Sequence, residues 1–230
     1  YNLDPSDVEK KITDATSAIL AVHVYGNPCY VRELEDIAQN NNLKLIFDAA
    51  HSFGVEYNNK SVFRYGDIST LSFHATKVFH SIEGGGLVVK DSELLNKIRL
   101  MRNHGIKSED EIVLPGTNAK MNELQAIMGI CNLENIDAYI EARKKLYNTY
   151  KENLKRISSL RFQKIIASKY NYSYMPLLFD SRVKRDKTYS ELIKNGIKPR
   201  KYFFPLVTDF HYFQNRRNKD NYKSLQNAKK

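Results

Sequence analysis

The stretch that decides the fold of this 230-residue chain is Leu71–Gly86, LSFHATKVFHSIEGGG. One apolar strand is predicted over residues 68–73, and a second follows the three glycines at residues 87–89. Lys77 lies between these two strands. A lysine at the end of a buried strand is costly unless it is solvated, paired or chemically used. Two interpretations are therefore open: a solvated loop lysine, or an amine whose pKa is lowered by burial so that it attacks carbonyl groups.

Two further apolar runs predict parallel strands earlier in the chain. Ala18–Val22 and Leu43–Phe47 flank an amphipathic helix predicted over Val31–Ala38, which gives a βαβ unit. In such sheets, ligands bind beyond the carboxyl ends of the strands. Taken alone, Asp48 fits a helix cap or turn residue and His51 fits a structural histidine. Together, we expect the polar groups at the strand ends to converge on one edge of the sheet: His23, Asp48, His51, Ser72 and Lys77.

The composition is that of a globular protein with one good core, since 42% of the residues are hydrophobic and 27% are charged. The sequence contains no signal-peptide pattern and no apolar run long enough to span a bilayer. Cys29 and Cys131 fit no metal-ligand spacing and are predicted to be buried free thiols. We predict no metal site, because no His/Cys/Asp/Glu group has ligand spacing.

The net charge of +10 raises the alternative of a basic, nucleic-acid-binding regulator. The lysines and arginines are spread along the chain, however, and no zinc-finger or RNP pattern accompanies them. The charge therefore indicates solvated faces, and nucleic acid is not expected to be a partner.

The chain resembles the DegT/DnrJ/EryC1/StrS aminotransferases in three segments: FDAAHSFG (Phe47–Gly54), LSFHATKVFHSIEGGGLVV (Leu71–Val89) and GTNAKMNELQAIMGICNL (Gly116–Leu133). HVYG (His23–Gly26) and PRKYFFPL (Pro199–Leu206) are similar to two further segments of the family. The resemblance implies an α/β protein of the PLP-dependent transferase fold type I, aspartate aminotransferase-like, with a mainly parallel sheet. It also implies transamination of a nucleotide-linked keto-(deoxy)sugar with pyridoxal 5'-phosphate (PLP) as cofactor.

The resemblance assigns roles to four of the residues at the strand ends. Lys77 would hold PLP as a Schiff base and then move a proton between the substrate carbon and the cofactor. Asp48 would pair with the protonated pyridine nitrogen, which keeps the ring able to accept electrons. His51 stands at the family's Gln/His position near the ring oxygen, and Ser72 would bind the cofactor phosphate. A related branch of the family has histidine at the lysine position and removes a hydroxyl group, so Lys77 favours the transaminase.

Further partners are implied by the same resemblance. Asn118 would reach the cofactor phosphate of the neighbouring subunit in a homodimer, and Arg200 and Tyr202 are candidates for shaping the sugar-nucleotide side. The substrate would be a dTDP- or UDP-linked keto-sugar, and the amino donor would be glutamate. The parent protein is expected in the cytoplasm, where it would make an amino sugar for a surface polysaccharide or a glycosylated product.

The predicted domains are residues 1–138, the C-terminal part of the PLP-binding large domain, and residues 139–230, an incomplete small C-terminal domain. Members of the family carry a long N-terminal part that holds a phosphate-binding turn and an aromatic that stacks on PLP. We therefore expect the chain to be a piece of a longer enzyme. A truncated, non-catalytic module that only binds or dimerises remains an alternative.

Other elements are predicted from capping residues and helical spacing. The sequence predicts a short helix that starts at Pro5 and has Val8, Ile12 and Ala15 on one face. It also predicts a strand over residues 172–179 and helices over residues 92–102, 120–136, 139–157 and 186–195.

Overall fold

The computed structural model describes residues 1–214, and the chain forms two compact units. The first unit comprises residues 1–154 and 163–176. The second comprises residues 155–162 and, within the described residues, 177–214. The chain thus leaves the first unit, returns to it for one segment, and leaves it again.

This division differs from the predicted domains, 1–138 and 139–230. The helix that follows residue 138 packs with the first unit, because its Tyr147 is buried and meets the ring of Tyr170 edge to face, with ring centroids 6.3 Å apart. Tyr170 lies in the returning segment 163–176. A contact between residues so far apart in sequence left no local pattern from which the boundary could be predicted.

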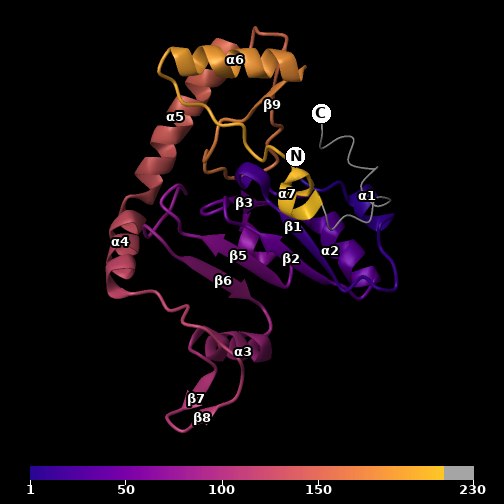
Figure 1. Ribbon diagram of the computed structural model, residues 1–230, viewed down its shortest axis with the longest axis vertical. Helices are drawn as coiled ribbons and strands as arrows, with labels where there is room; N and C mark the ends of the chain where they lie inside the picture. Colours follow the sequence, from indigo (N-terminus) through magenta and orange to yellow (C-terminus); the bar gives the residue numbers. More distant parts are fainter. Residues whose placement is uncertain (215–230) are drawn as a thin grey trace. The chain divides into compact units, whose positions relative to one another are not determined.

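A four-stranded sheet forms the centre of the first unit, in the order β1, β2, β5, β6 (Figure 1). β1, β2 and β5 are parallel, and β6 pairs antiparallel with β5. The strands are β1 (Ala18–Val22), β2 (Lys44–Asp48), β5 (Ile68–Ser72) and β6 (Gly85–Val89). Each overlaps a predicted apolar run, so the predicted α/β class with a mainly parallel sheet is confirmed.

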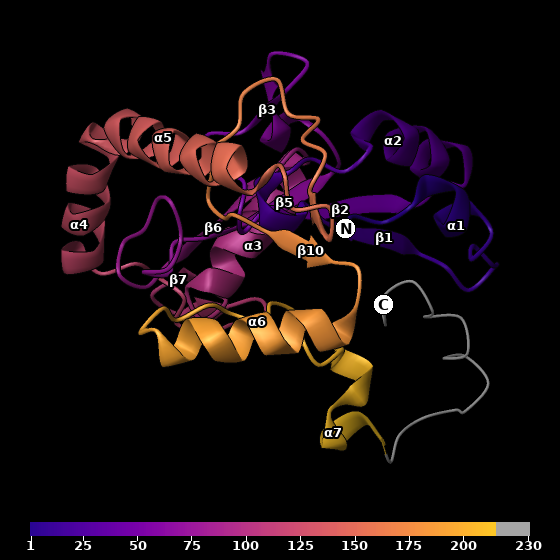
Figure 2. The same cartoon turned by 90° about the horizontal axis from the view of Figure 1, so that it is seen from above.

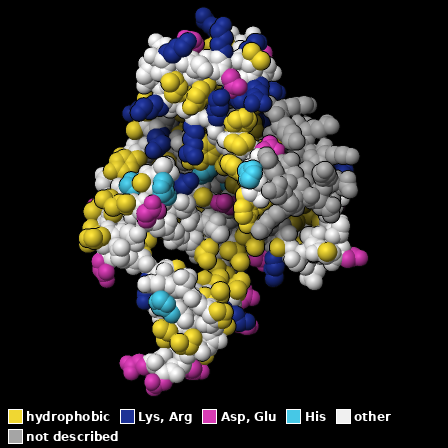
Figure 3. Space-filling view, viewed as in Figure 1, with side chains coloured by type: hydrophobic (Ala, Val, Ile, Leu, Met, Phe, Trp, Pro, Cys, Tyr) yellow, Lys and Arg dark blue, Asp and Glu magenta, His cyan; other side chains and the backbone are white. Residues whose placement is uncertain are grey.

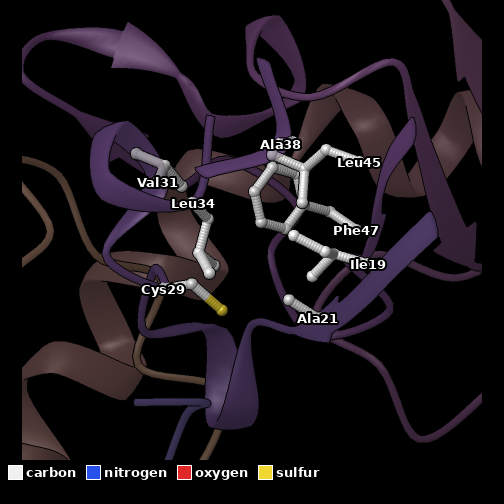
Figure 4. Packing of buried hydrophobic residues seen from close by; sticks show 8 residues of the cluster. All are labelled: Ile19, Ala21, Cys29, Val31, Leu34, Ala38, Leu45 and Phe47. Atoms are coloured by element: carbon white, nitrogen blue, oxygen red, sulfur yellow. The ribbon is translucent and has the colours of Figure 1, made fainter. Parts of the chain in front are cut away.

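Helix α2 (Val31–Asn40) connects β1 to β2 and buries one face against them. Figure 4 shows the core that results, formed by Ile19, Ala21, Cys29, Val31, Leu34, Ala38, Leu45 and Phe47. Both cysteines are free thiols: Cys29 is buried, whereas Cys131 is exposed. The prediction of buried thiols is therefore correct for Cys29 and wrong for Cys131, which lies on a helix face that no described residue covers.

The first helix is shorter than predicted. α1 (Pro5–Glu9) begins at the predicted cap, where the carboxylate of Asp4 accepts the amide N–H of Ser6 at 3.0 Å. It does not continue, because the hydroxyl of Thr16 accepts the amide N–H of Thr13 at 3.0 Å and a separate turn forms there. Local hydrogen bonds of threonine compete with helix in this way.

The remaining elements of the first unit are two short hairpins, two 3-10 turns and three helices. They are η1 (Val24–Gly26), β3 (Glu56–Tyr57), β4 (Lys60–Ser61), η2 (Val62–Arg64), α3 (Ser92–Arg102), β7 (Ile106–Ser108), β8 (Glu111–Ile112), α4 (Glu123–Glu134) and α5 (Ile136–Leu154). Helices α2 and α4 lie at opposite ends of the sheet (Figure 2). The helix predicted over residues 92–102 is confirmed, with the carboxylate of Asp91 as its cap.

The second unit contains a two-stranded antiparallel sheet and helix α6. Its elements are β9 (Leu160–Phe162), β10 (Leu177–Phe179), α6 (Arg182–Lys194), η3 (Val207–Asp209) and α7 (His211–Gln214). Lysine and arginine side chains gather over α6 (Figure 3). The polar tail at residues 215–230, which the predicted small domain includes, lies outside the described residues.

The core predicts a difference between two leucines. Leu34 on α2 is fully buried, whereas Leu146 on α5 is 63% exposed. We expect Leu34→Ala to lower the free energy of unfolding by about 2–5 kcal/mol, because it removes apolar contacts and leaves a cavity. Leu146→Ala, the control, should change it by about 0.5 kcal/mol or less. Urea titration monitored by circular dichroism would compare the two, and equal losses would contradict the assigned core.

Candidate active site

Asp48 and Ser72 lie at the carboxyl ends of neighbouring parallel strands. Asp48 ends β2 and stands opposite Thr70 of β5, and Ser72 ends β5 two residues later. Oδ1 of Asp48 accepts the amide N–H of Ala50 at 3.0 Å, which holds the carboxyl group in the turn after β2. The parallel pairing therefore brings a carboxylate and a hydroxyl group to the same edge of the sheet, as predicted.

His51 lies in the turn that follows β2 and is 8% exposed. Its Nδ1 accepts the amide N–H of Tyr25 at 3.2 Å, and the Tyr174 ring lies 4.7 Å from the imidazole, centroid to centroid. Burial, and then the positive charge of Lys77, lower the pKa of His51 to about 4, against the opposing negative charge of Asp48. The imidazole is therefore neutral near pH 7.

Lys77 is half-buried in the loop between β5 and β6. The ends of this loop are tied together, since the amide N–H of Phe73 donates to the carbonyl of Gly84 at 2.9 Å. Beneath it, Phe79 stacks on Phe53 with ring centroids 4.2 Å apart. Gly84 has φ +151°, and a Cβ there would lie 2.5 Å from Oγ of Ser81. This glycine lets the chain re-enter the sheet directly after the lysine loop.

Three predicted site residues therefore lie together in the first unit. The pKa of His51 responds to the charges of both Lys77 and Asp48, which places an amine and a carboxylate within electrostatic range of one imidazole. The amine can attack a carbonyl group, the carboxylate can stabilise a nearby cation, and the imidazole can donate or accept a proton.

His23, which was also expected at this edge, lies in the core instead. It is fully buried, its ring stacks on Phe47 at 4.5 Å, and its Nδ1 accepts the amide N–H of Cys29 at 3.0 Å. Burial lowers the pKa of His23 to about 4. The position after β1 suggested a site residue, but His23 continues the alternation of β1, in which Ile19 and Ala21 are buried on the core face.

The other predicted residues lie elsewhere. Asn118 is exposed and forms a β-bridge with Asn103, just after α3. Arg200 and Tyr202 belong to the second unit, where the guanidinium lies 4.8 Å from the centre of the tyrosine ring.

The segment of Arg200 and Tyr202 is tied to α6 by an ion pair. Nζ of Lys201 lies 2.7 Å from Oδ1 of Asp186. The hydrogen bond from Lys201, and then that from Arg185, lowers the pKa of Asp186 to about 2. This ion pair ties the segment back to the N-terminal half of α6.

Three residues around His51 were not predicted from the sequence. Tyr25 and Tyr174 contact His51, and the buried Asn171 donates its side-chain amide to the carbonyl of His51 at 2.8 Å. For Tyr25, the HVYG segment with its glycine was a usable signal. Tyr174 and Asn171 are more than a hundred residues from His51 in sequence, and no local pattern marks them.

The described residues contain no group of three or more His, Cys, Asp or Glu side chains placed to hold a metal ion. Within the same residues, no helix is long and apolar enough to cross a membrane.

The sequence matches the profile of the DegT/DnrJ/EryC1/StrS aminotransferase family over residues 1–230. It is 42% identical over 215 residues to a dTDP-4-amino-4,6-dideoxy-D-glucose transaminase of Shigella dysenteriae, an alignment that covers 90% of this chain and 58% of that protein.

Solved structures give the same result. Helicobacter pylori PseC, an aminotransferase involved in the biosynthesis of pseudoaminic acid, is similar with a TM-score of 0.88 and 28% identity over 97% of this chain and 62% of its own. An E. coli GDP-4-keto-6-deoxy-D-mannose-3-dehydratase with bound hydrated PLP is similar with a TM-score of 0.77 and 25% identity, over 86% of this chain and 56% of its own. The predicted fold type I is thereby confirmed. This chain spans about three fifths of the length of these relatives.

The buried histidines predict how stability changes with pH. The pKa of His23 is about 4 in the folded chain and about 6.5 when exposed, so between these values the unfolded chain binds a proton that the folded chain does not. The free energy of unfolding should therefore fall as the pH falls from about 6.5 to 4, by up to about 3 kcal/mol for His23, and be flat above. His51 acts in the same direction.

Urea titrations at pH 7, 6, 5 and 4.5 would measure this dependence. His74→Gln, which replaces an exposed histidine, is the control and should keep the same slope. A stability that does not change between pH 6.5 and 4.5 would contradict the neutral, buried state of His23.

Proposed function

The chain belongs to the DegT/DnrJ/EryC1/StrS aminotransferase family, and we propose that its protein transfers an amino group to a keto carbon of a nucleotide-linked deoxysugar, with PLP as cofactor. The observation that supports this most directly is the grouping of Lys77 with Asp48 and His51 at the end of parallel strands. A histidine at position 77 would instead have indicated the dehydratase branch of the family.

The residues at this edge fit the cofactor. PLP requires an amine for its aldehyde, a carboxylate for its ring nitrogen and hydrogen-bond donors for its phosphate. Lys77 is half-buried on a loop tied at both ends, and Asp48 is oriented by the N–H of Ala50. Ser72 ends the neighbouring strand. These are the three chemical groups that the cofactor needs, on one edge of one sheet.

Each residue then has a distinct role. Lys77 would hold the cofactor through Nζ, Asp48 would keep the ring nitrogen protonated, and Ser72 would donate its hydroxyl to the phosphate. His51 would donate to the ring oxygen. When bound, the cofactor supplies an electron sink for the carbon that loses a proton.

Lys77 performs the proton transfer at the reacting carbon. As a neutral amine, Nζ takes the proton from that carbon. As an ammonium, it then gives the proton to a second carbon. The place of Lys77 on the loop that joins β5 to β6, at the edge of the sheet that also carries Asp48, supports this role.

The proposed substrate follows the name of a relative, whereas the proposed donor and location follow the resemblance to the family. The Shigella dysenteriae relative is named as a transaminase of a dTDP-linked dideoxysugar, which supports a dTDP-linked keto-sugar here. Glutamate is the proposed amino donor and the cytoplasm the proposed location. Arg200 and Tyr202 are proposed to shape the sugar-nucleotide side.

We also propose a homodimer in which α4 contributes to the contact. This helix exposes an apolar face: Leu124, Ile127, Ile130 and Leu133 are each more than half exposed. Hydrophobic side chains gather over α4 in Figure 3. A surface of this kind marks an interaction site in a globular protein. Asn118, which precedes α4, is proposed to reach the cofactor phosphate of the neighbouring subunit.

Lys77→Ala tests the proposed chemistry. The purified chain would be incubated with PLP and treated with borohydride, and the reduced adduct would be located by mass mapping. We expect the adduct on Lys77, and we expect Lys77→Ala to abolish it and to lower transamination by roughly 10³-fold or more. Lys144→Ala, which removes an exposed lysine of α5, is the control and should change neither.

An adduct on another lysine would contradict the assignment. If the adduct formed only in a chain extended at its N-terminus, Lys77 would keep its role and the present residues would act as a binding or dimerisation module alone. No adduct in either chain would end the proposal. Salt-sensitive binding to duplex DNA in its place would favour the basic regulator.

Ile127→Asp tests the proposed homodimer. Ile127 is 56% exposed on α4, and an aspartate there would place an unpaired charge in the subunit contact. Sedimentation should show a dimer for the unchanged chain and a monomer for the variant. Val183→Asp, at a 78% exposed valine on α6, should remain dimeric. A dimeric Ile127→Asp variant would exclude α4 from the contact.

A further inference from the structure

The segment 163–176, here called the strap, packs against the part of the first unit that contains His51. It runs between β9 and β10 and comes to lie beside β3 (Figures 1 and 2), where the carbonyl of Lys169 accepts the amide N–H of Glu56 at 2.9 Å. Its Tyr170 is buried in a hydrophobic cluster with Val55 and Val62. Apolar packing thus fixes the strap against the turn that follows β2.

Asn171 of the strap holds the backbone of that turn. Its side chain is fully buried, and its Nδ2 donates to the carbonyl of His51 at 2.8 Å and to the carbonyl of Phe53 at 2.9 Å. Both hydrogens of the amide are therefore used on the turn. Oγ of Ser173 lies 2.8 Å from Oδ1 of Asn171, which fixes the orientation of the amide group.

Tyr170 of the strap holds a second turn, the one after β1. Its hydroxyl donates to the carbonyl of Tyr25 at 2.7 Å, and Tyr25 has φ +60°, an unfavourable conformation for a residue with a Cβ. In this conformation the amide N–H of Tyr25 meets Nδ1 of His51 at 3.2 Å. The next residue, Gly26, has φ +82°, and a Cβ there would lie 2.6 Å from the carbonyl oxygen of His51.

These contacts determine which nitrogen of His51 carries the proton. In a neutral imidazole one nitrogen donates and the other accepts. Nδ1 accepts from Tyr25, so the proton is on Nε2. The ring of Tyr174, also in the strap, covers the imidazole at 4.7 Å and restricts its rotation.

We propose that the strap is a positioning element for His51: through Tyr170, Asn171 and Tyr174 it fixes the imidazole as an Nε2–H donor. This inference rests on the proposed function only for the identity of the acceptor, the cofactor's ring oxygen. The lowered pKa of His51 supports the proposal, because an imidazole that is neutral near pH 7 carries a single N–H. With Nδ1 as an acceptor, that N–H is on Nε2.

The test uses the chain without cofactor. Histidines labelled with ¹⁵N report the protonation of both ring nitrogens by NMR, and loss of one signal pair in His51→Gln assigns them. We expect Nδ1 unprotonated and Nε2 protonated at pH 7. Tyr170→Phe keeps the ring packing and removes only the hydrogen bond to Tyr25, so the Nδ1–H form should rise about fivefold, the effect of one ordinary hydrogen bond.

Tyr150→Phe is the matched control, since Tyr150 is 54% exposed on α5, and it should leave the His51 nitrogens unchanged. A proton on Nδ1 in the unchanged chain would overturn the proposal. Unchanged His51 signals in a folded Tyr170→Phe variant would also overturn it. If PLP never binds Lys77, the proposed function fails but this readout still decides the role of the strap.

Discussion

The parallel pairing of β2 with β5 is the constraint on which the site depends. In this register Ile46 stands opposite Ile68 and Asp48 opposite Thr70, and the amide N–H of Ala49 continues the ladder to the carbonyl of Thr70 at 2.9 Å. A slip of one residue would exchange the two faces of the strand. The buried ring of Phe47 on β2 opposes such a slip, because it would then leave the core. Core packing thus places the carboxylate of Asp48.

The sequence predicts the strands and the strand ends well, for a physical reason. A strand covered on both faces is a continuous apolar run, and the first polar residues after it mark the edge where ligands bind. Asp48, Ser72 and Lys77 were predicted as site residues in this way, and the structure brings Asp48, His51 and Lys77 within electrostatic range. Helix lengths were predicted less well, since α1 ends at Glu9 and a separate threonine turn forms after it.

Contacts between distant residues account for what the sequence could not predict. The strap contacts His51 across more than a hundred residues of sequence. No local sequence pattern distinguishes its Asn171 from an ordinary loop asparagine. The division into two units has the same origin, because Tyr147 packs on Tyr170 of the strap. His23 shows the opposite error: its position after β1 was predicted correctly, but it continues the core face of Ile19 and Ala21, and its ring stacks on Phe47.

The region around β1, β2 and β5 also contains buried polar atoms that reduce stability. Nε2 of His23, Oγ of Ser52 and Oγ of Ser69 are buried without a hydrogen-bond partner among the described residues. Each such atom costs about 1–3 kcal/mol. Tyr25 adds an unfavourable backbone conformation in the adjoining turn.

In proteins, such local costs concentrate at functional sites and are offset by packing elsewhere. Here the offset comes from the apolar cluster of α2 with β1 and β2 and from the tyrosine cluster of the strap. The two clusters lie on either side of the turn of His51 in sequence, so the same packing that stabilises the first unit also holds the polar edge in one arrangement.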